Sequence, residues 1–147
     1  HENIGYGTIA LPEEEMHTSS FWIGFKPAVL QDFTNEQKEY VLVGLANLVQ
    51  NLASIFLMCD PQDLRVTPQV KAVETEMPTL FVYDRYPGGT GLAEGLFNVS
   101  RDVLKAALEL AAGCSCRDGC PSCVGPPQLV GEQARELVVK LLSRCLA

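Results

Sequence analysis

Four cysteines within ten residues are the part of this sequence best suited to chemistry. They are Cys114, Cys116, Cys120 and Cys123, in the spacing C-x-C-x3-C-x2-C. Four thiolates this close together can surround one ion at Zn–S distances of roughly 2.3 Å, the geometry of a structural zinc site. Gly119 and Pro121 suit the tight turn from which a C-x2-C pair binds a metal. The spacing predicts a four-coordinate zinc site that leaves no position for a catalytic water.

Two other uses of these cysteines stay open on spacing alone. In a secreted protein they could form two disulfides, and an iron–sulfur cluster also takes four thiolates, although its usual spacings differ. The remaining cysteines, Cys59 and Cys145, are isolated, and no signal peptide is visible. These features favour a reducing compartment, so we expect the protein in the cytoplasm, with Cys59 and Cys145 as buried, inert thiols.

Composition indicates one folded unit. With 147 residues and 47% hydrophobic side chains, the chain can bury a core, and we expect a single domain over 1–147 with a zinc knot at 113–125. A short tag remnant or a piece cut from a longer protein would explain the start at His1. The net charge of -7 opposes broad, non-specific attraction to nucleic acid phosphates by this piece alone.

A long apolar helix is the clearest predicted element. Thr34 and Gln37 have the form of a capping box, so a helix should start there and run over 34–58. Residues 40–59 carry no charge, a length that must be tested against a membrane span. A polar stripe at i, i+3, i+4 and i+7 argues against a span and predicts hydrogen bonds to neighbouring loops: Asn47, Gln50, Asn51 and Ser54. The other faces should be nearly buried, and they carry Val41, Leu42, Leu45, Leu48, Val49, Leu52, Ile55 and Phe56.

Strands and further helices surround this helix. Residues 5–10, 18–25 and 80–84 are rich in β-branched and aromatic side chains and read as strands, the second ended by Pro27. Residues 64–75 are mixed, and Pro68 allows only an edge strand or a loop there. Helical patterns follow at 92–112 and 130–146, one on each side of the cysteines. The zinc knot should therefore fix the angle between two C-terminal helices.

Other residues that could do chemistry have structural readings as well. Asp60 and Asp63 could form a carboxylate pair, or begin a turn and cap the next element. The glycine-rich run 85–91 lies between a strand and a helix, where backbone N–H groups can bind an anion, but it matches neither phosphate-binding motif. The histidines are His1 and His17, and we find no arrangement fit for nucleophilic catalysis.

Four segments together resemble a known family. They are the Gly-Tyr-Gly-Thr opening with Glu15-Met16-His17-Thr18, the run 58–64 (Met-Cys-Asp-Pro-Gln-Asp-Leu), the run 83–91 (Tyr-Asp-Arg-Tyr-Pro-Gly-Gly-Thr-Gly), and the cysteine knot. In this order they resemble the zinc-binding C-terminal domain (MZB) of MrfA-type DEAD/DEAH-box helicases. The resemblance covers nearly the whole chain, and the last two segments are its most specific part.

The resemblance implies a parent protein and a ligand set. The parent would be a superfamily 2 ATP-dependent DNA helicase implicated in DNA repair, with two RecA-like motor domains upstream of this module. Cys114, Cys116, Cys120 and Cys123 would be the ligands of a structural Zn²⁺. ATP and Mg²⁺ would bind only to the motor domains, because this chain has no Walker-type loop and no DEAD/DEAH box. Relatives of the domain also occur in phage-defence proteins.

We therefore expect an α/β (α+β) fold: a small, mostly antiparallel sheet packed on the long helix, with a four-cysteine zinc knot between two C-terminal helices. The first hypothesis is a non-catalytic accessory domain that braces the helicase motor and contacts single-stranded DNA. Its phosphate contacts would come from residues around the glycine run and the knot: Arg85, Gly88, Gly89, Arg101, Lys105 and Arg117.

Two further hypotheses differ in class. One is a protein-interaction module without DNA contact, which an exposed apolar patch and scattered basic residues would favour. The other is a hydrolase that uses Asp60, Asp63 and Asp84 with a second metal, which requires these carboxylates to lie within a few Å of one another. We expect the motor domains of the same chain and DNA as partners, and no membrane.

Overall fold

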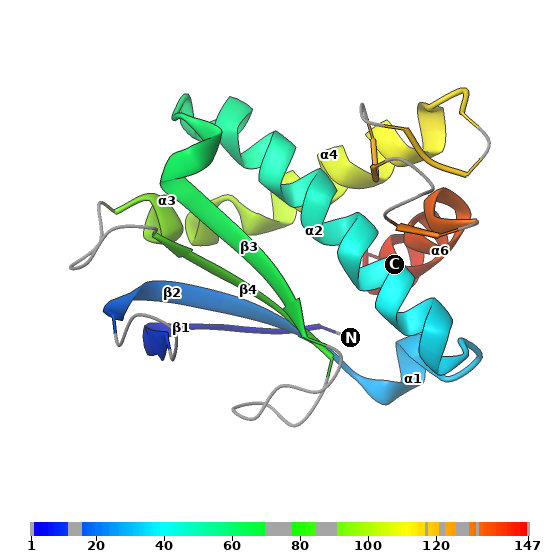
Figure 1. Ribbon diagram of the computed structural model, residues 1–147, viewed down its shortest axis with the longest axis horizontal. Coiled ribbons are helices and arrows are strands. Elements are labelled where there is room, and N and C mark those ends of the chain that lie inside the picture. The colour runs from blue at the N-terminus through cyan, green and yellow to red at the C-terminus, as the bar shows by residue number, and fades with distance from the viewer. Residues whose placement is uncertain are drawn as a thin grey trace.

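The computed structural model describes residues 2–11, 16–69, 78–84, 91–116, 118–120, 123–125, 130–131 and 133–146 (Figure 1). The strands are β1 (Glu2–Leu11), β2 (Met16–Phe25), β3 (Leu64–Gln69) and β4 (Thr79–Asp84). The helices are α1 (Pro27–Leu30), α2 (Asn35–Leu57), the 3-10 helix η1 (Pro61–Asp63), α3 (Leu92–Asn98), α4 (Ser100–Gly113) and α6 (Ala134–Leu146).

The four strands form one antiparallel sheet in the order β1-β2-β4-β3. This confirms the predicted small antiparallel sheet in an α+β fold. Pro68 lies in β3, an edge strand, opposite Leu80 of β4. A proline has no N–H to give to a second neighbour, so the edge is the position that the sequence allows.

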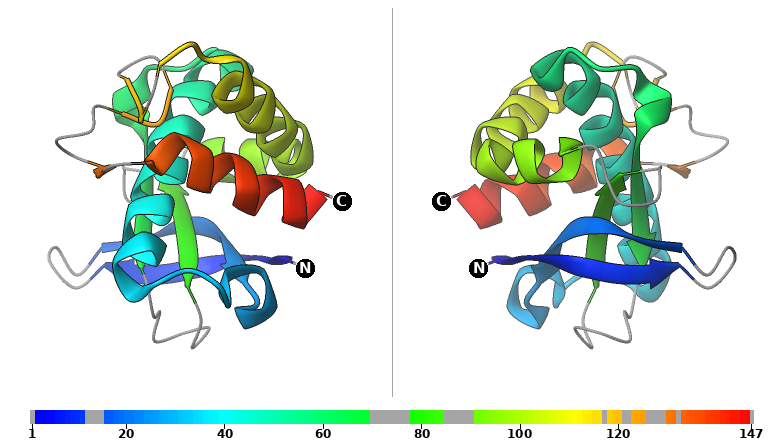
Figure 2. Two further views of the ribbon diagram at one scale, coloured as in Figure 1. Left: turned by 90° about the vertical axis from the view of Figure 1, so that its right-hand side faces the viewer. Right: turned by 90° about the vertical axis from the view of Figure 1, so that its left-hand side faces the viewer.

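One face of the sheet carries the apolar side chains that meet the helices. Phe21 and Ile23 of β2 lie beside Val82 and Leu80 of β4, and all four are buried in the main core. Because side chains alternate between the two faces of a strand, this register places the four on the same face. Figure 2 shows α3, α4, α6 and most of α2 on one side of the β1–β2 ribbon. The sheet and the helices therefore share one core, in which Phe21 contacts Phe97 of α3 edge to face.

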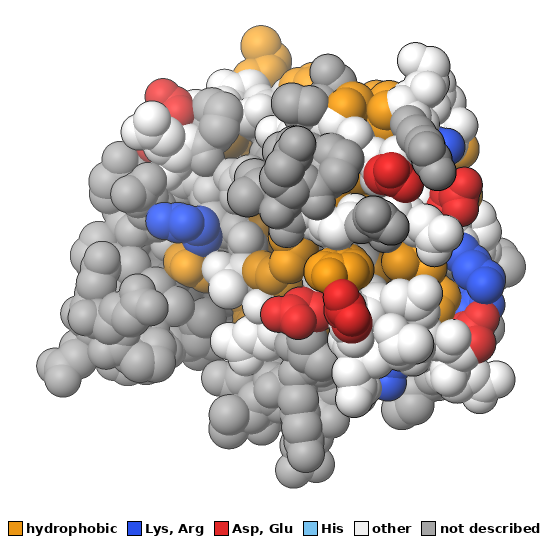
Figure 3. Space-filling view, turned by 45° about the vertical axis from the view of Figure 1, so that its right-hand side comes forward, with side chains coloured by type: hydrophobic (Ala, Val, Ile, Leu, Met, Phe, Trp, Pro, Cys, Tyr) orange, Lys and Arg blue, Asp and Glu red, His pale blue; other side chains and the backbone are white. Residues whose placement is uncertain are grey.

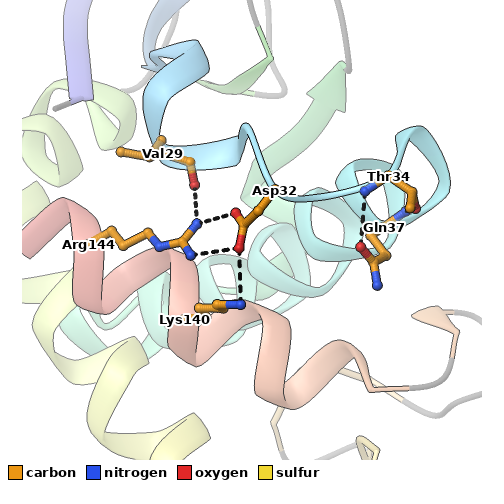
Figure 4. A network of polar contacts seen from close by, with 6 residues as sticks. All are labelled: Val29, Asp32, Thr34, Gln37, Lys140 and Arg144. Atoms are coloured by element: carbon orange, nitrogen blue, oxygen red, sulfur yellow. Dashed lines mark hydrogen bonds and ion pairs between the residues drawn. The ribbon is translucent and has the colours of Figure 1, made fainter.

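Helix α2 is the central element, as predicted. Its capping box is present: Gln37 N donates to Thr34 Oγ1, and Thr34 N donates to Gln37 Oε1, both at 3.0 Å (Figure 4). The helix contacts β3, α3, α4 and α6. It is long and apolar enough to cross a membrane by length and composition, but nearly half of the matching window is buried inside the domain. This burial accounts for much of its charge-free sequence.

The polar stripe of α2 bonds as predicted at two of its four positions. Asn47 Nδ2 donates to the backbone oxygen of Val124 at 2.9 Å, in the loop that carries the last cysteine. Gln50 bonds to edge strand β3 with both ends of its amide: Nε2 donates to Leu64 O at 2.6 Å, and Oε1 accepts from Val66 N at 2.9 Å. Ser54 bonds within its own helix, to Asn51 O. The stripe thus joins the sheet to the cysteine loop.

Three details of the sequence prediction were wrong. The predicted helix over 92–112 is two helices, because the backbone at Val99 leaves the helical region (φ -113°, ψ 16°). Ile55 and Phe56 were expected on nearly buried faces but are 70% and 40% exposed. At this end α2 packs on α3 through Leu57, whose Cδ2 would lie 3.3 Å from a Cβ on Gly95, and its other faces are left uncovered by the described residues. The second strand does end before Pro27, as predicted, and Pro27 also starts α1. The last helix begins at Ala134 rather than at 130.

Candidate metal centre

The four predicted ligands lie together where the chain leaves α4. The sulfur atoms of Cys114, Cys116, Cys120 and Cys123 are all within 4.8 Å of one another. Cys114 Sγ is 3.5 Å from Cys120 Sγ, and Cys123 Sγ is 3.5 Å from Cys116 Sγ and 3.6 Å from Cys120 Sγ. A tetrahedron with Zn–S bonds of roughly 2.3 Å has edges of roughly 3.8 Å. The four sulfurs therefore already have nearly the separation that one zinc ion requires.

These distances exclude disulfides within the cluster, because an S–S bond is about 2.05 Å long. All six cysteines are free thiols in the structure. Cys123 is fully buried, and the other three are partly buried. The donor set is therefore four thiols, held in a partly water-excluded position.

Without metal, the thiols differ in acidity. A hydrogen bond from the Cys116 backbone, together with the neighbouring thiols, lowers the pKa of Cys114 to about 7. Burial, followed by the effect of Cys114, raises the pKa of Cys116 to about 12, and burial also raises the pKa of Cys123. Thiolates crowded together repel one another, so a cation that neutralises them is the natural occupant.

The loop that carries the last two cysteines is a tight turn. Cys123 N and Gly125 N both donate to Cys120 O, at 3.0 and 2.9 Å. Gly125 has φ +109°, and a Cβ there would lie 2.7 Å from Asn47 Nδ2. A Cβ on Gly119 would lie 2.5 Å from Gly125 O. Glycine at both positions therefore lets the turn close on itself and on α2.

Helices on three sides hold the cluster. Gly44 of α2 gives room to Val124 beside the cluster and to Val138 of α6, each of which would lie 3.2 Å from a Cβ on this glycine. Asp118 accepts hydrogen bonds from the chain that leads into α6: its Oδ1 from Gln133 N and its backbone oxygen from Arg135 N, both at 3.0 Å. Arg135 Nη1 in turn donates to Ala111 O, near the end of α4, at 3.0 Å. The cluster thus lies between α4 and α6, as predicted.

Asp118 and Arg135 are the residues of this site that sequence reasoning missed. Asp118 stands within the cysteine run, where a carboxylate at a turn is an ordinary signal for a backbone hydrogen bond. Arg135 gave no signal, because its partner Ala111 lies 24 residues away in the chain.

The predicted DNA contacts are only partly within the described residues. Arg85, Gly88, Gly89 and Arg117 lie outside them. Arg101 and Lys105 are exposed, one turn apart on α4, the helix that leads into the cysteine cluster. On the face drawn in Figure 3, the described Lys and Arg side chains lie at separate places, with acidic side chains beside several of them. This face shows no gathered basic surface among its described residues.

The three carboxylates of the hydrolase hypothesis do not form a site. In the described part of the chain, the one group of three or more potential metal ligands is the four cysteines. Asp60 Oδ1 accepts from Gln62 N at the start of η1. Asp84 is fully buried at the end of β4, and its two oxygens accept from Gly91 N at 3.1 Å and from Ala93 N at 2.8 Å. Asp60 therefore begins the turn η1, as its structural reading predicted, and Asp84 caps α3.

A closed cluster of four cysteines on an α+β scaffold defines a structural zinc-binding domain. The chain belongs to the family of the MrfA Zn-binding domain (MZB), whose family model matches residues 45–124. The resemblance stated from the sequence is thereby confirmed, and the cluster is suited to the zinc ion after which the family is named.

Relatives of known sequence and structure agree. The chain is 45% identical over 143 residues to the uncharacterized ATP-dependent helicase YprA of Bacillus subtilis (strain 168), covering 97% of this chain and 19% of that protein. A crystal structure of the DUF1998 helicase MrfA bound to DNA matches with a TM-score of 0.81 and 43% identity, over 96% of this chain and 19% of that one. A second, of MrfA bound to DNA and AMPPNP, matches with a TM-score of 0.69 and 41% identity, over 95% and 17%.

A shorter match is to the Druantia protein DruE of Escherichia coli (strain UMEA 4076-1), 37% identical over 60 residues, 41% of this chain and 3% of that protein. The chain spans about a fifth of the length of the helicases that it matches over nearly all of its own length.

Proposed function

We propose that this chain is a non-catalytic, structural zinc-binding domain of a longer ATP-dependent DNA helicase. Residues 1–147 act as one accessory domain, with the zinc knot at 113–125 and Cys114, Cys116, Cys120 and Cys123 as the zinc ligands. The observation that carries this proposal is the closure of the site. Four sulfurs at tetrahedral spacing leave no coordination position for water or substrate, so the ion stabilises the fold and takes no part in a reaction.

The likeness to helicases supports the identity of the parent. YprA is named as an ATP-dependent helicase, and the MrfA structures hold DNA and, in one of them, AMPPNP. We infer that ATP and Mg²⁺ bind to motor domains outside this chain, and that the parent works in DNA repair in the cytoplasm.

The role that fits the domain best is to brace the motor and to contact single-stranded DNA as it leaves the motor. Arg101 and Lys105 are the described residues that would contact DNA phosphates, because both are exposed on α4, the helix whose other end leads into the cluster. The net charge of -7 limits this to a local contact.

The zinc assignment is tested by metal analysis of the purified, reduced protein and of the Cys120→Ser variant. We expect about one zinc ion per wild-type chain and a large loss in the variant. Because a structural zinc ion contributes much of the folding free energy of small domains, the variant should unfold about 10 °C or more below wild type. Wild-type protein without metal, and an unchanged unfolding temperature in the variant, would refute the proposal.

The DNA contact is tested by binding of fluorescent single-stranded DNA at several salt concentrations. The double change Arg101→Ala with Lys105→Ala should weaken binding about three- to tenfold at low salt. The slope of binding against salt concentration should fall by the equivalent of about two released counterions. The matched control is Lys26→Ala with Arg65→Ala, which removes the same charge from exposed residues of other elements. Equal losses in both pairs would mean that only net charge matters.

A second candidate function is a protein-interaction module that does not touch DNA. It is favoured by the exposed apolar side chains at the end of α2, Ile55, Phe56 and Met58. If wild-type protein binds no single-stranded DNA at low salt, this candidate replaces the DNA contact and leaves the zinc assignment unchanged.

A further inference from the structure

The C-terminal end of α2 exposes three large apolar side chains, which we call the α2 tip: Ile55, Phe56 and Met58. They are 70%, 40% and 93% exposed and are the exposed large hydrophobic side chains among the described residues. The same helix buries nine of its residues between Val41 and Ala53 in the core. In Figure 1, the tip lies at the end of α2 opposite to α1. Apolar side chains grouped at one exposed end mark a surface that a partner covers.

The backbone at Met58 gives a second, independent reason. Met58 ends α2 in the left-handed conformation (φ 52°, ψ 41°), and its N–H donates to Ser54 O. Glycine, or sometimes asparagine, normally occupies such a cap, because a side chain with a Cβ is strained there. Here the position holds a long apolar side chain that is almost wholly in water. Both backbone strain and exposure count against methionine here, which favours a contact outside the described structure.

The edge of the α2 tip is acidic. Asp60, which caps η1, and Asp63, the last residue of η1, follow Met58 shortly after in the chain and are exposed and half-buried, respectively. An apolar centre with an acidic edge is complementary to an apolar pocket with basic residues at its edge. The α2 tip itself therefore indicates the chemistry of its partner.

Size indicates where that partner lies. Three side chains offer on the order of a few hundred Å² of apolar surface. A stable interface between separate molecules buries roughly 800 Å² on each side, so the α2 tip alone is too small to hold a dimer or an independent protein. A partner in the same polypeptide is present at high effective concentration and needs less area. This chain spans 19% of the related helicases, which leaves about four fifths of such a polypeptide to supply the partner.

We propose that the α2 tip docks into an apolar pocket with a basic edge on another domain of the same longer polypeptide. Met58 enters the pocket, and Ile55 and Phe56 pack at its edge. This inference rests on the proposed function, in which the chain is an accessory domain that braces a motor. The inference identifies the α2 tip as the surface through which this accessory domain contacts the rest of the polypeptide.

Methionine oxidation of the full-length polypeptide tests the contact directly. Hydrogen peroxide oxidises exposed methionines, and peptide mass spectrometry gives the rate for Met58 in the native and in the guanidine-denatured protein. Docking should slow Met58 oxidation about tenfold or more in the native protein, because the side chain is covered. Similar native and denatured rates would overturn the proposal, since this structure leaves Met58 almost fully exposed.

A second copy of the chain is the alternative occupant. Sedimentation of residues 1–147 should show a monomer at all concentrations. A dimer that the change Met58→Asp dissolves would overturn docking within one polypeptide.

Two glycine variants of the full-length polypeptide separate docking from backbone strain. Met58→Gly removes strain and the docking side chain together. Gln133→Gly is the matched control, because Gln133 is the other non-glycine residue with positive φ among those described (φ 63°) and is also exposed. Both variants should keep or raise the unfolding temperature. Only Met58→Gly should speed amide hydrogen exchange in residues 55–59, by about tenfold, because only this variant loses the docked partner that protects the α2 tip.

Equal exchange in the two variants would overturn the proposal. The proposed function fails by a different result, which is a wild-type polypeptide that shows no ATP-dependent DNA unwinding. The oxidation and exchange results remain interpretable in that case, since neither depends on helicase activity.

Discussion

Asp32 and Arg144 form a two-bond ion pair across 112 residues of chain, with Nη1 to Oδ1 at 2.7 Å and Nη2 to Oδ2 at 2.9 Å (Figure 4). Arg144 Nη1 also donates to Val29 O, and Lys140 Nζ lies 3.1 Å from Asp32 Oδ2. Both cations lie over the ring of Phe33, 5.8 Å (Lys140) and 5.4 Å (Arg144) from its centroid. The turn before α2 is therefore fixed to α6, the helix that follows the cysteine cluster.

The first prediction concerns the pH dependence of this pair. The guanidinium of Arg144, then the ammonium of Lys140, holds the pKa of Asp32 well below its usual value of 3.8. A lowered pKa in the folded state means that the stabilisation is complete above pH 3.8 and is lost as the pH falls toward the folded value. Asp32→Asn should therefore lower the unfolding temperature at pH 7, and the difference from wild type should shrink below about pH 4.

Thermal unfolding monitored by circular dichroism between pH 2.5 and 8 measures this difference. Glu109→Gln, a change of the same kind at an exposed position on α4, serves as control and should show no comparable difference at pH 7. Because Asp32 is close to solvent, added salt should weaken the effect. A difference that is constant down to pH 2.5 would contradict an ionic origin.

The second prediction concerns Asn47, which joins α2 to the cysteine loop. Asn47→Ala leaves the oxygen of Val124, a fully buried residue, without this hydrogen bond, at a cost of about 1–3 kcal/mol. It should also speed zinc loss to a chelator, because the turn that carries Cys123 loses its support. Denaturant unfolding and a colorimetric zinc assay measure the two effects.

Asn51→Ala is the control for Asn47, since it makes the same change one turn along the same stripe at an exposed residue. It should alter stability by less than about 0.5 kcal/mol and leave zinc release unchanged. Equal effects of both changes would mean that helix propensity, rather than the bond to Val124, is responsible.

Features set by neighbouring residues could be predicted from the sequence. The capping box at Thr34 and Gln37 gives the start of α2 to the residue. The proline at position 68 places β3 at an edge, and the cysteine spacing gives the metal cluster. The physical causes are a side-chain cap, a missing N–H and four close sulfurs. Each of them acts within a few residues of chain.

Features set by distant partners could not be predicted. The break at Val99 carries neither glycine nor proline, so no local signal marks it. Hydrophobic periodicity does not tell a core residue from a docking residue, which is why Ile55 was expected to be buried. Asp84 gave a false hint of catalysis because the two N–H groups that it caps lie seven and nine residues further along the chain.

The third prediction concerns Asp84 as the cap of α3. Gly91, the residue just before α3, has no side chain that could cap the helix. The carboxylate of Asp84, at the end of β4, accepts the hydrogen bonds of the first N–H groups instead. Asp84→Ala should destabilise the protein by about 2–4 kcal/mol, because the buried N–H of Ala93 and the partly buried N–H of Gly91 lose their acceptor. Asp84→Asn keeps one acceptor oxygen and should cost less.

Asp60→Ala is the matched control, since Asp60 caps the exposed turn η1 rather than a core helix, and it should cost about 1 kcal/mol or less. Denaturant unfolding of the three variants gives the loss in free energy of unfolding for each, and so their order. A stable Asp84→Ala variant would show that the carboxylate is kept for another purpose.

The fourth prediction concerns the glycine after the last cysteine. Gly125→Ala places a Cβ at φ +109°, 2.7 Å from Asn47 Nδ2, so the substitution strains the backbone and pushes Asn47 away from Val124. The cost should be about 2–4 kcal/mol, the sum of left-handed strain and a weakened buried hydrogen bond. The matched control is Gly113→Ala, just before the first cysteine, where nothing lies within 4 Å of the new Cβ. That change should be neutral or stabilise the end of α4 by up to about 1 kcal/mol. Opposite signs in the two variants, measured by unfolding of the zinc-loaded protein, would show that close packing of the cysteine loop on α2 holds the metal cluster in place. Equal small effects would place the support of the cluster elsewhere, in the bonds from Asp118 to the start of α6.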